Sequence, residues 1–161
     1  RQDDMRTIQR VCAVFRDVPV SIVNYAEGTR ATRAKRVAAD SPYQSLLPPK
    51  AGGTAFAVNA MAEVLDGILD MTMAYVNTPE PSFWDLLCGR IPEVAVRLRY
   101  VPVPADLARG DYTADAAYRE RFKAWLDDLW ADKDAAVTAL QNPDHPATRF
   151  EELAAADADR G

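Results

Sequence analysis

The spacing of apolar positions changes several times along the chain, and each change predicts a new element. Apolar side chains at helical spacing predict a helix, whereas short runs rich in β-branched residues predict a strand. Pro19 follows the first helical pattern and Gly67 follows the second, as is typical of helix ends. In order, the pattern predicts a helix over residues 5–15, a strand over 18–25, a turn-rich loop over 30–53, a helix over 54–65, a strand over 68–76, a short amphipathic stretch over 83–88 and a strand over 93–103.

The order strand, loop, helix, strand is that of a crossover unit, in which two strands pair in parallel. The predicted fold class is therefore α/β, with a partial, mainly parallel sheet flanked by helices and a helical extension at the C-terminus. In the last strand, apolar and other residues alternate: Val94, Val96, Leu98 and Tyr100 against Ala95, Arg97 and Arg99. We expect one face of this strand to pack and the arginine face to reach solvent or an anionic ligand.

The chain changes character after Pro104. Helical spacing predicts helices over residues 113–130 and 132–140, and the aromatic stripe on the first of them predicts core packing. This region either caps the sheet or forms an exposed appendage. Residues 1–105 contain 12 Lys and Arg against 11 Asp and Glu, whereas residues 106–161 contain 7 against 13. We therefore divide the chain into a first part, residues 1–105, and an acidic helical extension, residues 106–161.

Composition narrows the class of protein. The chain has 161 residues, a length that is enough for one domain with a sizeable core. Of these residues 48% are apolar and 27% are charged, which is the composition of an ordinary globular protein. No stretch of apolar residues is long enough to cross a bilayer, and the net charge of −5 disfavours nucleic-acid binding. Cys12 and Cys88 stand among apolar residues and lack metal-ligand spacing. We expect buried free thiols in a reducing compartment, a disulfide being the less favoured alternative.

The loop after the strand over residues 18–25 holds the most distinctive chemistry. Glu27, Gly28, Thr29 and Arg30 place an acid, a flexible backbone position, a hydroxyl and a guanidinium within four residues. Lys50 and Gly52 lie just before the next predicted helix, where an ammonium group and backbone amides can face the same anion as Arg30. This pattern indicates an anion site, and a tight turn with a solvated basic loop is the alternative. The glycine and lysine spacing of a P-loop is absent, which disfavours a nucleotide hydrolase.

Three segments together resemble a known family. They are residues 22–30 (IVNYAEGTR), 46–52 (LLPPKAG) and 69–75 (LDMTMAY), the last two separated by a predicted helix. In this order they resemble the glycerolipid acyltransferases, specifically the 1-acylglycerol-3-phosphate (lysophosphatidate) acyltransferase group. The resemblance covers roughly residues 1–105. The Asp-x-Thr strand and residues 83–87 (FWDLL) are similar to the branch with bacterial inner-membrane acyltransferases and lysocardiolipin acyltransferases.

The resemblance implies transfer of a fatty acyl group from an acyl-CoA or acyl-carrier-protein thioester to the free hydroxyl of a lysophospholipid. It implies no cofactor, and it implies a histidine base with an aspartate five positions later. The one histidine here, His145, is followed five positions later by Phe150 and does not match. Because the family places its base upstream of the Glu-Gly-Thr-Arg loop, and because the chain opens on Arg1, we expect a larger enzyme that supplies both the base and a membrane contact. The alternative is a non-catalytic module that binds phospholipid headgroups or coenzyme A phosphates.

The resemblance also implies roles for individual residues. Arg30 would bind the acceptor phosphate and Lys50 would add a second cation. Gly28 and Gly52 would give access to backbone N–H groups, and Thr29 a hydroxyl. Glu27 would either hold Arg30 and the loop in place or contact the glycerol hydroxyl of the acceptor. The implied location is the cytoplasmic face of a membrane, in bacteria the inner membrane.

Three further side chains keep two interpretations each. Asp70 and Thr72 either satisfy backbone groups of a loop, which we favour, or act in catalysis. Trp84 lies either at a membrane interface or in the core.

Overall fold

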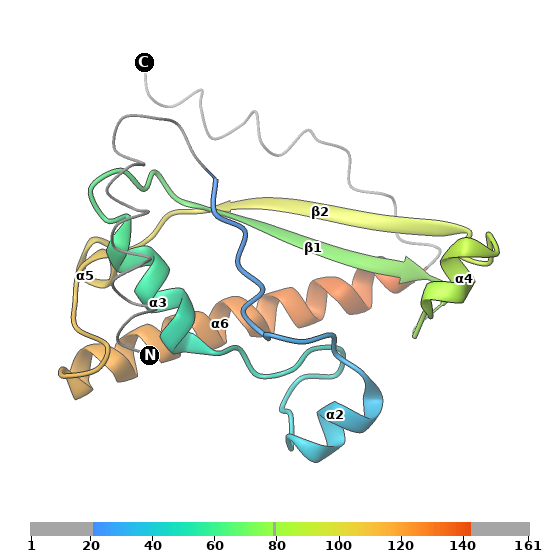
Figure 1. Cartoon of the computed structure of the whole chain (residues 1–161), viewed down its shortest axis with the longest axis horizontal. Helices are drawn as coiled ribbons and strands as arrows, with labels where there is room; N and C mark the ends of the chain where they lie inside the picture. Colours follow the sequence, from blue (N-terminus) through green and yellow to red (C-terminus); the bar gives the residue numbers. More distant parts are fainter. Residues whose placement is uncertain (1–20, 79, 143–161) are drawn as a thin grey trace.

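The computed structural model describes residues 21–78 and 80–142, and Figure 1 shows the course of the chain. Two strands and five helices lie in the described part. In chain order they are α2 (Arg33–Ala38), α3 (Ala51–Ala60), β1 (Ile68–Val76), α4 (Phe83–Leu87), β2 (Glu93–Val101), α5 (Ala105–Ala108) and α6 (Ala116–Gln141).

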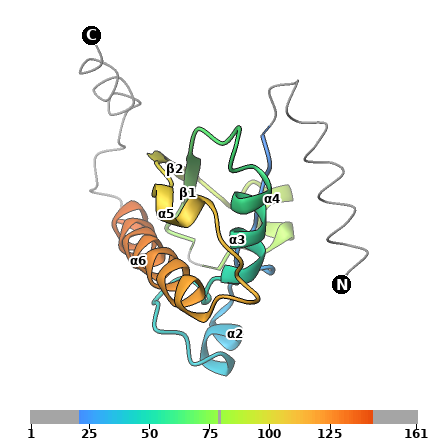
Figure 2. The same ribbon diagram turned by 90° about the vertical axis from the view of Figure 1, so that its left-hand side faces the viewer.

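The sheet is a two-stranded antiparallel pair, so the predicted mainly parallel sheet is wrong. Ile68 of β1 lies opposite Val101 of β2, and Val76 lies opposite Glu93, with α4 in the connection between the strands. Because β2 follows β1 directly and the connection over residues 77–92 folds back, the strands form a long hairpin instead of a crossover unit. The two views in Figures 1 and 2 show the hairpin lying beside α6, with α4 at its far end.

The predicted strand over residues 18–25 does not form in its described part, residues 21–25, where the backbone is irregular. Residues 18–20 and the predicted helix over residues 5–15 lie outside the described residues. Val23 and Tyr25 are exposed, although the prediction placed them in a buried strand. A strand needs a neighbouring backbone for its hydrogen bonds, and neither β1 nor β2 pairs with this segment among the described residues.

The core forms where α6 crosses the rest of the molecule. α6 contacts both strands, α3 and α5, and it runs without interruption over the two predicted helices. Tyr118, Phe122 and Leu126 of α6 are buried against Ala55 and Val58 of α3, which confirms that the aromatic stripe is core. The C-terminal helical region therefore packs against the sheet, and its exposed-appendage alternative is wrong for residues 116–141.

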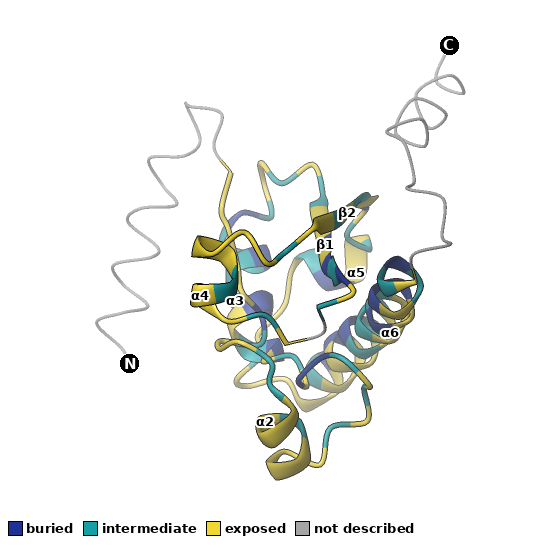
Figure 3. Cartoon of the chain, turned by 90° about the vertical axis from the view of Figure 1, so that its right-hand side faces the viewer, coloured by how far each residue is buried: buried dark blue, intermediate teal, exposed yellow. Residues whose placement is uncertain are grey.

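Two short helices are fixed by local capping. The Thr32 hydroxyl accepts a hydrogen bond from the Lys35 backbone and begins α2 inside the predicted loop. Ser82 and Asp85 form a reciprocal capping box at the start of α4, so the amphipathic stretch over residues 83–88 forms a short helix. Both helices lie at the surface, and Figure 3 shows them coloured as exposed almost throughout.

The faces of the hairpin are reversed relative to the expectation. The exposed face is apolar, and its members are Leu69, Met71, Met73, Val94, Val96 and Tyr100. The opposite face, which carries Asp70, Thr72, Arg97 and Arg99, contacts side chains of α6. The arginine face is thus the covered one. It also carries Ala74, Val76 and Val101, which are buried, so apolar packing and charged partners on α6 cover it together.

Candidate functional site

The two loops singled out in the sequence meet in the structure. The chain turns at Gly28, whose N–H donates to the Tyr25 carbonyl at 2.8 Å, and the Lys50 N–H donates to the Ala26 carbonyl at 2.8 Å. These hydrogen bonds join residues 25–28 to the residue that precedes α3. The backbone therefore places the first candidate loop against the second.

Gly28 and Lys50 are in direct contact. Gly28 has φ = +70°, a left-handed conformation that a residue with a Cβ rarely adopts. A Cβ placed at Gly28 would lie 2.7 Å from the Lys50 Nζ atom, so the ammonium group occupies the space that a side chain would fill. Glycine at this position thus gives the ammonium group access to the turn.

Glu27 holds the two loops together. Its carboxylate accepts a hydrogen bond from the Leu47 N–H at 3.0 Å. Burial raises the pKa of the Glu27 carboxyl above its ordinary value, and the Leu47 N–H opposes that rise because it favours the ionised form. Of the two roles expected for Glu27, fastening the loop is the one that matches this contact, with Leu47 as its partner in place of Arg30.

Thr29 and Arg30 follow the turn and are exposed, and both contact Lys35. The Lys35 ammonium donates to the Thr29 hydroxyl at 2.6 Å and to the Arg30 carbonyl at 3.3 Å. Lys35 is a contact that the sequence analysis did not include among the site residues. The sequence indicates this contact only weakly, because it depends on α2, a helix that forms inside the loop predicted over residues 30–53 and brings Lys35 back to the turn.

Gly52 lies within the first turn of α3, since the helix begins at Ala51, three residues before the predicted start. A Cβ at Gly52 would lie 3.3 Å from the Tyr112 ring, so this glycine also allows close packing against the segment before α6. Lys50 is the residue before the helix and is exposed. As phosphate-binding residues, Glu27, Gly28, Thr29, Arg30, Lys50 and Gly52 stay a prediction.

α6 anchors the second loop. The Trp130 indole N–H donates to the Leu47 carbonyl at 3.1 Å, and the buried Asp134 carboxylate accepts from the backbone of Gln44 and Ser45 at 2.8 and 2.7 Å. The acidic helical extension therefore fixes the position of the segment that ends at Lys50.

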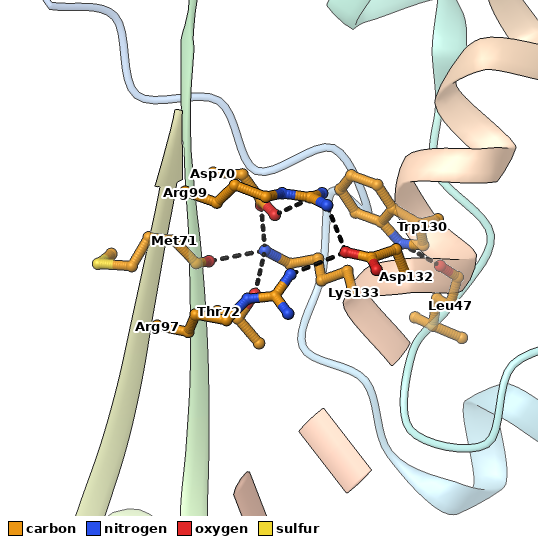
Figure 4. A network of polar contacts seen from close by, with 9 residues as sticks. All are labelled: Leu47, Asp70, Met71, Thr72, Arg97, Arg99, Trp130, Asp132 and Lys133. Carbon is orange, nitrogen blue, oxygen red and sulfur yellow. Dashed lines mark hydrogen bonds and ion pairs between the residues drawn. The ribbon is translucent and has the colours of Figure 1, made fainter. Parts of the chain in front are cut away.

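A second charged cluster lies between the hairpin and α6 (Figure 4). The Lys133 ammonium donates to the Asp70 carboxylate at 2.5 Å, to the Met71 carbonyl at 2.7 Å and to the Thr72 hydroxyl at 3.4 Å. Arg99 also pairs with Asp70, at 3.3 Å. The favoured interpretation of Asp70 and Thr72, that they satisfy loop backbone groups, is therefore wrong. Their partners are side chains from α6 and β2.

Asp132 completes this cluster. Its carboxylate accepts from Arg97 at 2.8 Å and also pairs with Arg99. The hydrogen bond from Arg97 lowers the pKa of the Asp132 carboxyl below its ordinary value. The anion that meets the arginine face of β2 is thus a side chain of this chain itself, which makes the cluster structural.

The remaining candidates divide by exposure. Cys88 is exposed, so its predicted burial is wrong, while Cys12 and His145 lie outside the described residues. Trp84 is exposed, which contradicts its core interpretation. Over residues 21–78 and 80–142, every helix is too short or too polar to span a bilayer.

Comparison with protein-family models, with curated proteins and with solved structures finds no match for this chain.

Proposed function

We propose that this chain supplies the acceptor-phosphate site of an acyltransferase, which moves a fatty acyl group from an acyl-CoA or acyl-carrier-protein thioester to the free hydroxyl of a lysophospholipid such as 1-acylglycerol-3-phosphate. The observation that carries the proposal is the contact between Gly28 and the Lys50 ammonium group. It supports the proposal because the resemblance assigns both residues to one anion site, and the fold brings them together across 22 residues of chain.

The chemistry at this site is recognition of a phosphate. Lys50 presents a point charge beside a turn, and Arg30 follows Gly28 by two residues, so its Cα lies within about 7 Å of Gly28. A guanidinium matches two phosphate oxygens with parallel N–H groups, whereas an ammonium adds charge without that geometry. Glu27 and α6 hold the two segments in place through Leu47. The site would orient the acceptor, and the base that takes its hydroxyl proton would come from outside residues 21–142.

Steady-state acyl transfer by the protein in its native reading frame tests the proposal. Arg30→Ala and Lys50→Ala should each raise the KM for lysophosphatidate about ten-fold or more, since a charge-assisted hydrogen bond contributes about 1.5–3 kcal/mol. The KM for the acyl donor should stay the same. Arg109→Ala is the matched control, because Arg109 is an exposed arginine at the end of α5 and is not one of the candidate site residues. An unchanged acceptor KM in both site variants would refute the phosphate assignment.

The second candidate is a binding module for phospholipid headgroups or coenzyme A phosphates. The sequence favours it in one respect, because the one histidine has no aspartate five positions later. A native reading frame that binds lysophosphatidate through Arg30 and Lys50 but transfers no acyl group would favour this module over the enzyme.

A further inference from the structure

The outward face of the hairpin, which lies opposite the face that α6 covers, holds apolar side chains alone. Besides its six exposed apolar residues it contains Tyr75, opposite Val94, and Leu98, opposite Met71. Residues directly opposite each other in an antiparallel pair share a face, so these eight positions make four pairs that are apolar on both strands. A face that meets water in an antiparallel sheet normally carries polar side chains. The outward face of this hairpin therefore has the composition of a covered one.

The outward face has the dimensions of one short helix. From Leu69 to Tyr75 a strand rises about 20 Å, and two neighbouring strands cover a width of about 10 Å. A helix of 11 residues is about 16 Å long and 10–12 Å wide. The sequence predicts such a helix over residues 5–15, which lie outside the described residues. Its apolar stripe consists of Met5, Ile8, Val11, Cys12, Val14 and Phe15.

The chain enters the described part on the side of the outward face. Figure 2 shows the hairpin between α6, on one side, and the start of the described chain, on the other, and Figure 1 shows that start at the same end of the molecule as the beginning of β1. The first apolar residues after the entry, Ile22 and Val23, are exposed. Five residues, 16–20, separate the predicted helix from this entry, and five residues extend over up to about 17 Å. The connection is thus comparable in length with the face itself.

We propose that residues 5–15 of this chain pack as an amphipathic helix on the outward face of the hairpin, with the apolar stripe against the four apolar pairs. A helix layered on a sheet buries the apolar side of both elements. The hairpin is then covered twice, by α6 on one face and by residues 5–15 on the other. This contact also holds residues 21–25, which pair with neither strand, and so fixes the entry to the turn at Gly28. The inference goes beyond the proposed function and does not rest on it.

A second copy of the chain fits the outward face less well. A segment joined to the face by a short connection has an effective concentration in the millimolar range, which a separate copy at micromolar concentration does not reach. A second copy on this face would also leave the apolar stripe over residues 5–15 without a partner. Both considerations favour the chain's own segment.

Crosslinking within the 161-residue chain tests the proposal. The chain has two cysteines, and Cys12 belongs to the apolar stripe. With Cys88→Ser in place, Met71→Cys puts a thiol on the outward face, and a short bismaleimide should join it to Cys12 within one chain. Val37→Cys is the matched control, because Val37 is exposed on α2 and outside the hairpin, and it should give little product. Peptide mapping identifies the joined pair, and gel electrophoresis separates monomers from dimers.

Alkylation rates give a second measurement, which needs no crosslink. With Cys12→Ala and Cys88→Ser in place, the thiol from Met71→Cys should react with iodoacetamide at least about ten-fold more slowly than the thiol from Val37→Cys, as for a face that is covered at least about 90% of the time. Ile8→Asp puts a charge on the apolar stripe and should abolish this protection.

Three results would overturn the proposal. Links between two chains, in place of links within one, would assign the outward face to a second copy. Equal crosslinking of Cys12 to positions 71 and 37 would show that the segment has no preferred position. An alkylation rate at position 71 that Ile8→Asp does not change would show that the apolar stripe does not cover the face.

Discussion

The turn at Gly28 yields a sharp prediction, because the chain contains a second glycine of nearly the same conformation. Gly28 and Gly89 have φ = +70° and +64°. A Cβ at Gly89 would have no atom within 4 Å, whereas one at Gly28 would lie 2.7 Å from the Lys50 Nζ atom. The pair Gly28→Ala and Gly89→Ala therefore separates backbone strain from displacement of the ammonium group.

Both variants should lose similar stability. The left-handed conformation costs an alanine about 1–2 kcal/mol, and the smaller entropy of the unfolded chain offsets about 0.4–1 kcal/mol of that. Each variant should therefore be destabilised by about 1 kcal/mol. The additional contact at Gly28 involves the end of a flexible lysine side chain, which can move away at little further cost. Urea unfolding followed by circular dichroism measures both values.

Anion binding should distinguish the two variants. Moving the Lys50 ammonium removes a charge-assisted hydrogen bond of about 1.5–3 kcal/mol, so Gly28→Ala should weaken binding of glycerol 3-phosphate at least about ten-fold. Gly89→Ala should bind as the parent chain does. Isothermal titration calorimetry gives the two affinities. If Gly28→Ala loses stability but binds like Gly89→Ala, then the contact between Gly28 and Lys50 has no part in anion binding and the reasoning is wrong.

Other contacts give three further predictions. Lys133→Met should lower the free energy of unfolding by about 2–3 kcal/mol in urea titrations, because it leaves the covered Asp70 carboxylate with one cation fewer; a loss under about 0.5 kcal/mol would contradict this. Tyr118→Phe should lower it by about 1–2 kcal/mol, since the buried hydroxyl donates to the Leu107 carbonyl at 2.8 Å, and an unchanged unfolding midpoint would count against that bond. The pKa of Glu27 is raised in the folded state, so at pH values just above the ordinary carboxyl pKa the folded chain binds more protons than the unfolded chain. The contribution of Glu27 to stability therefore falls as the pH rises from the ordinary pKa through the raised one. Glu27→Gln should remove that fall, so the difference in stability between variant and parent should grow from pH 4 to pH 7; a constant difference would contradict it.

Elements that depend only on the residues within one segment could be predicted from the sequence. The strand predicted over residues 68–76 is β1 to the residue, and the stretch over residues 83–88 contains α4. For the strand, the necessary information lies within the segment, in its β-branched and aromatic residues. The serine and aspartate that cap α4 also lie within one short segment, although only an amphipathic stretch was predicted there. The pairing of the strands was predicted wrongly, as parallel, because residues 18–25 have a strand's composition whether or not a partner lies beside them.

In the candidate site, too, features set by neighbouring residues could be predicted, whereas contacts between distant residues could not. Gly28 in a turn and Lys50 before a helix follow from local spacing, and the fold places them in contact. The ion pair between Lys133 and Asp70 joins residues 63 positions apart, and neither residue has a neighbour that marks the partner. Such contacts depend on how α6 crosses the hairpin, which periodicity along one segment does not determine.

The reversed faces of the hairpin follow from this limit. Alternation along β2 predicts that its two faces differ, but it does not predict which face another element covers. The usual expectation covers the apolar face, because polar groups lose hydration when they are buried. Here α6 carries Asp132 and Lys133 next to each other, and they meet Arg97 and Asp70 of opposite charge. The covered face also carries Ala74, Val76 and Val101, which are buried, and Ala74 packs against Val137 and Leu140 of α6. Apolar packing and the compensating charges of α6 together therefore select the face that alternation along the strand left open.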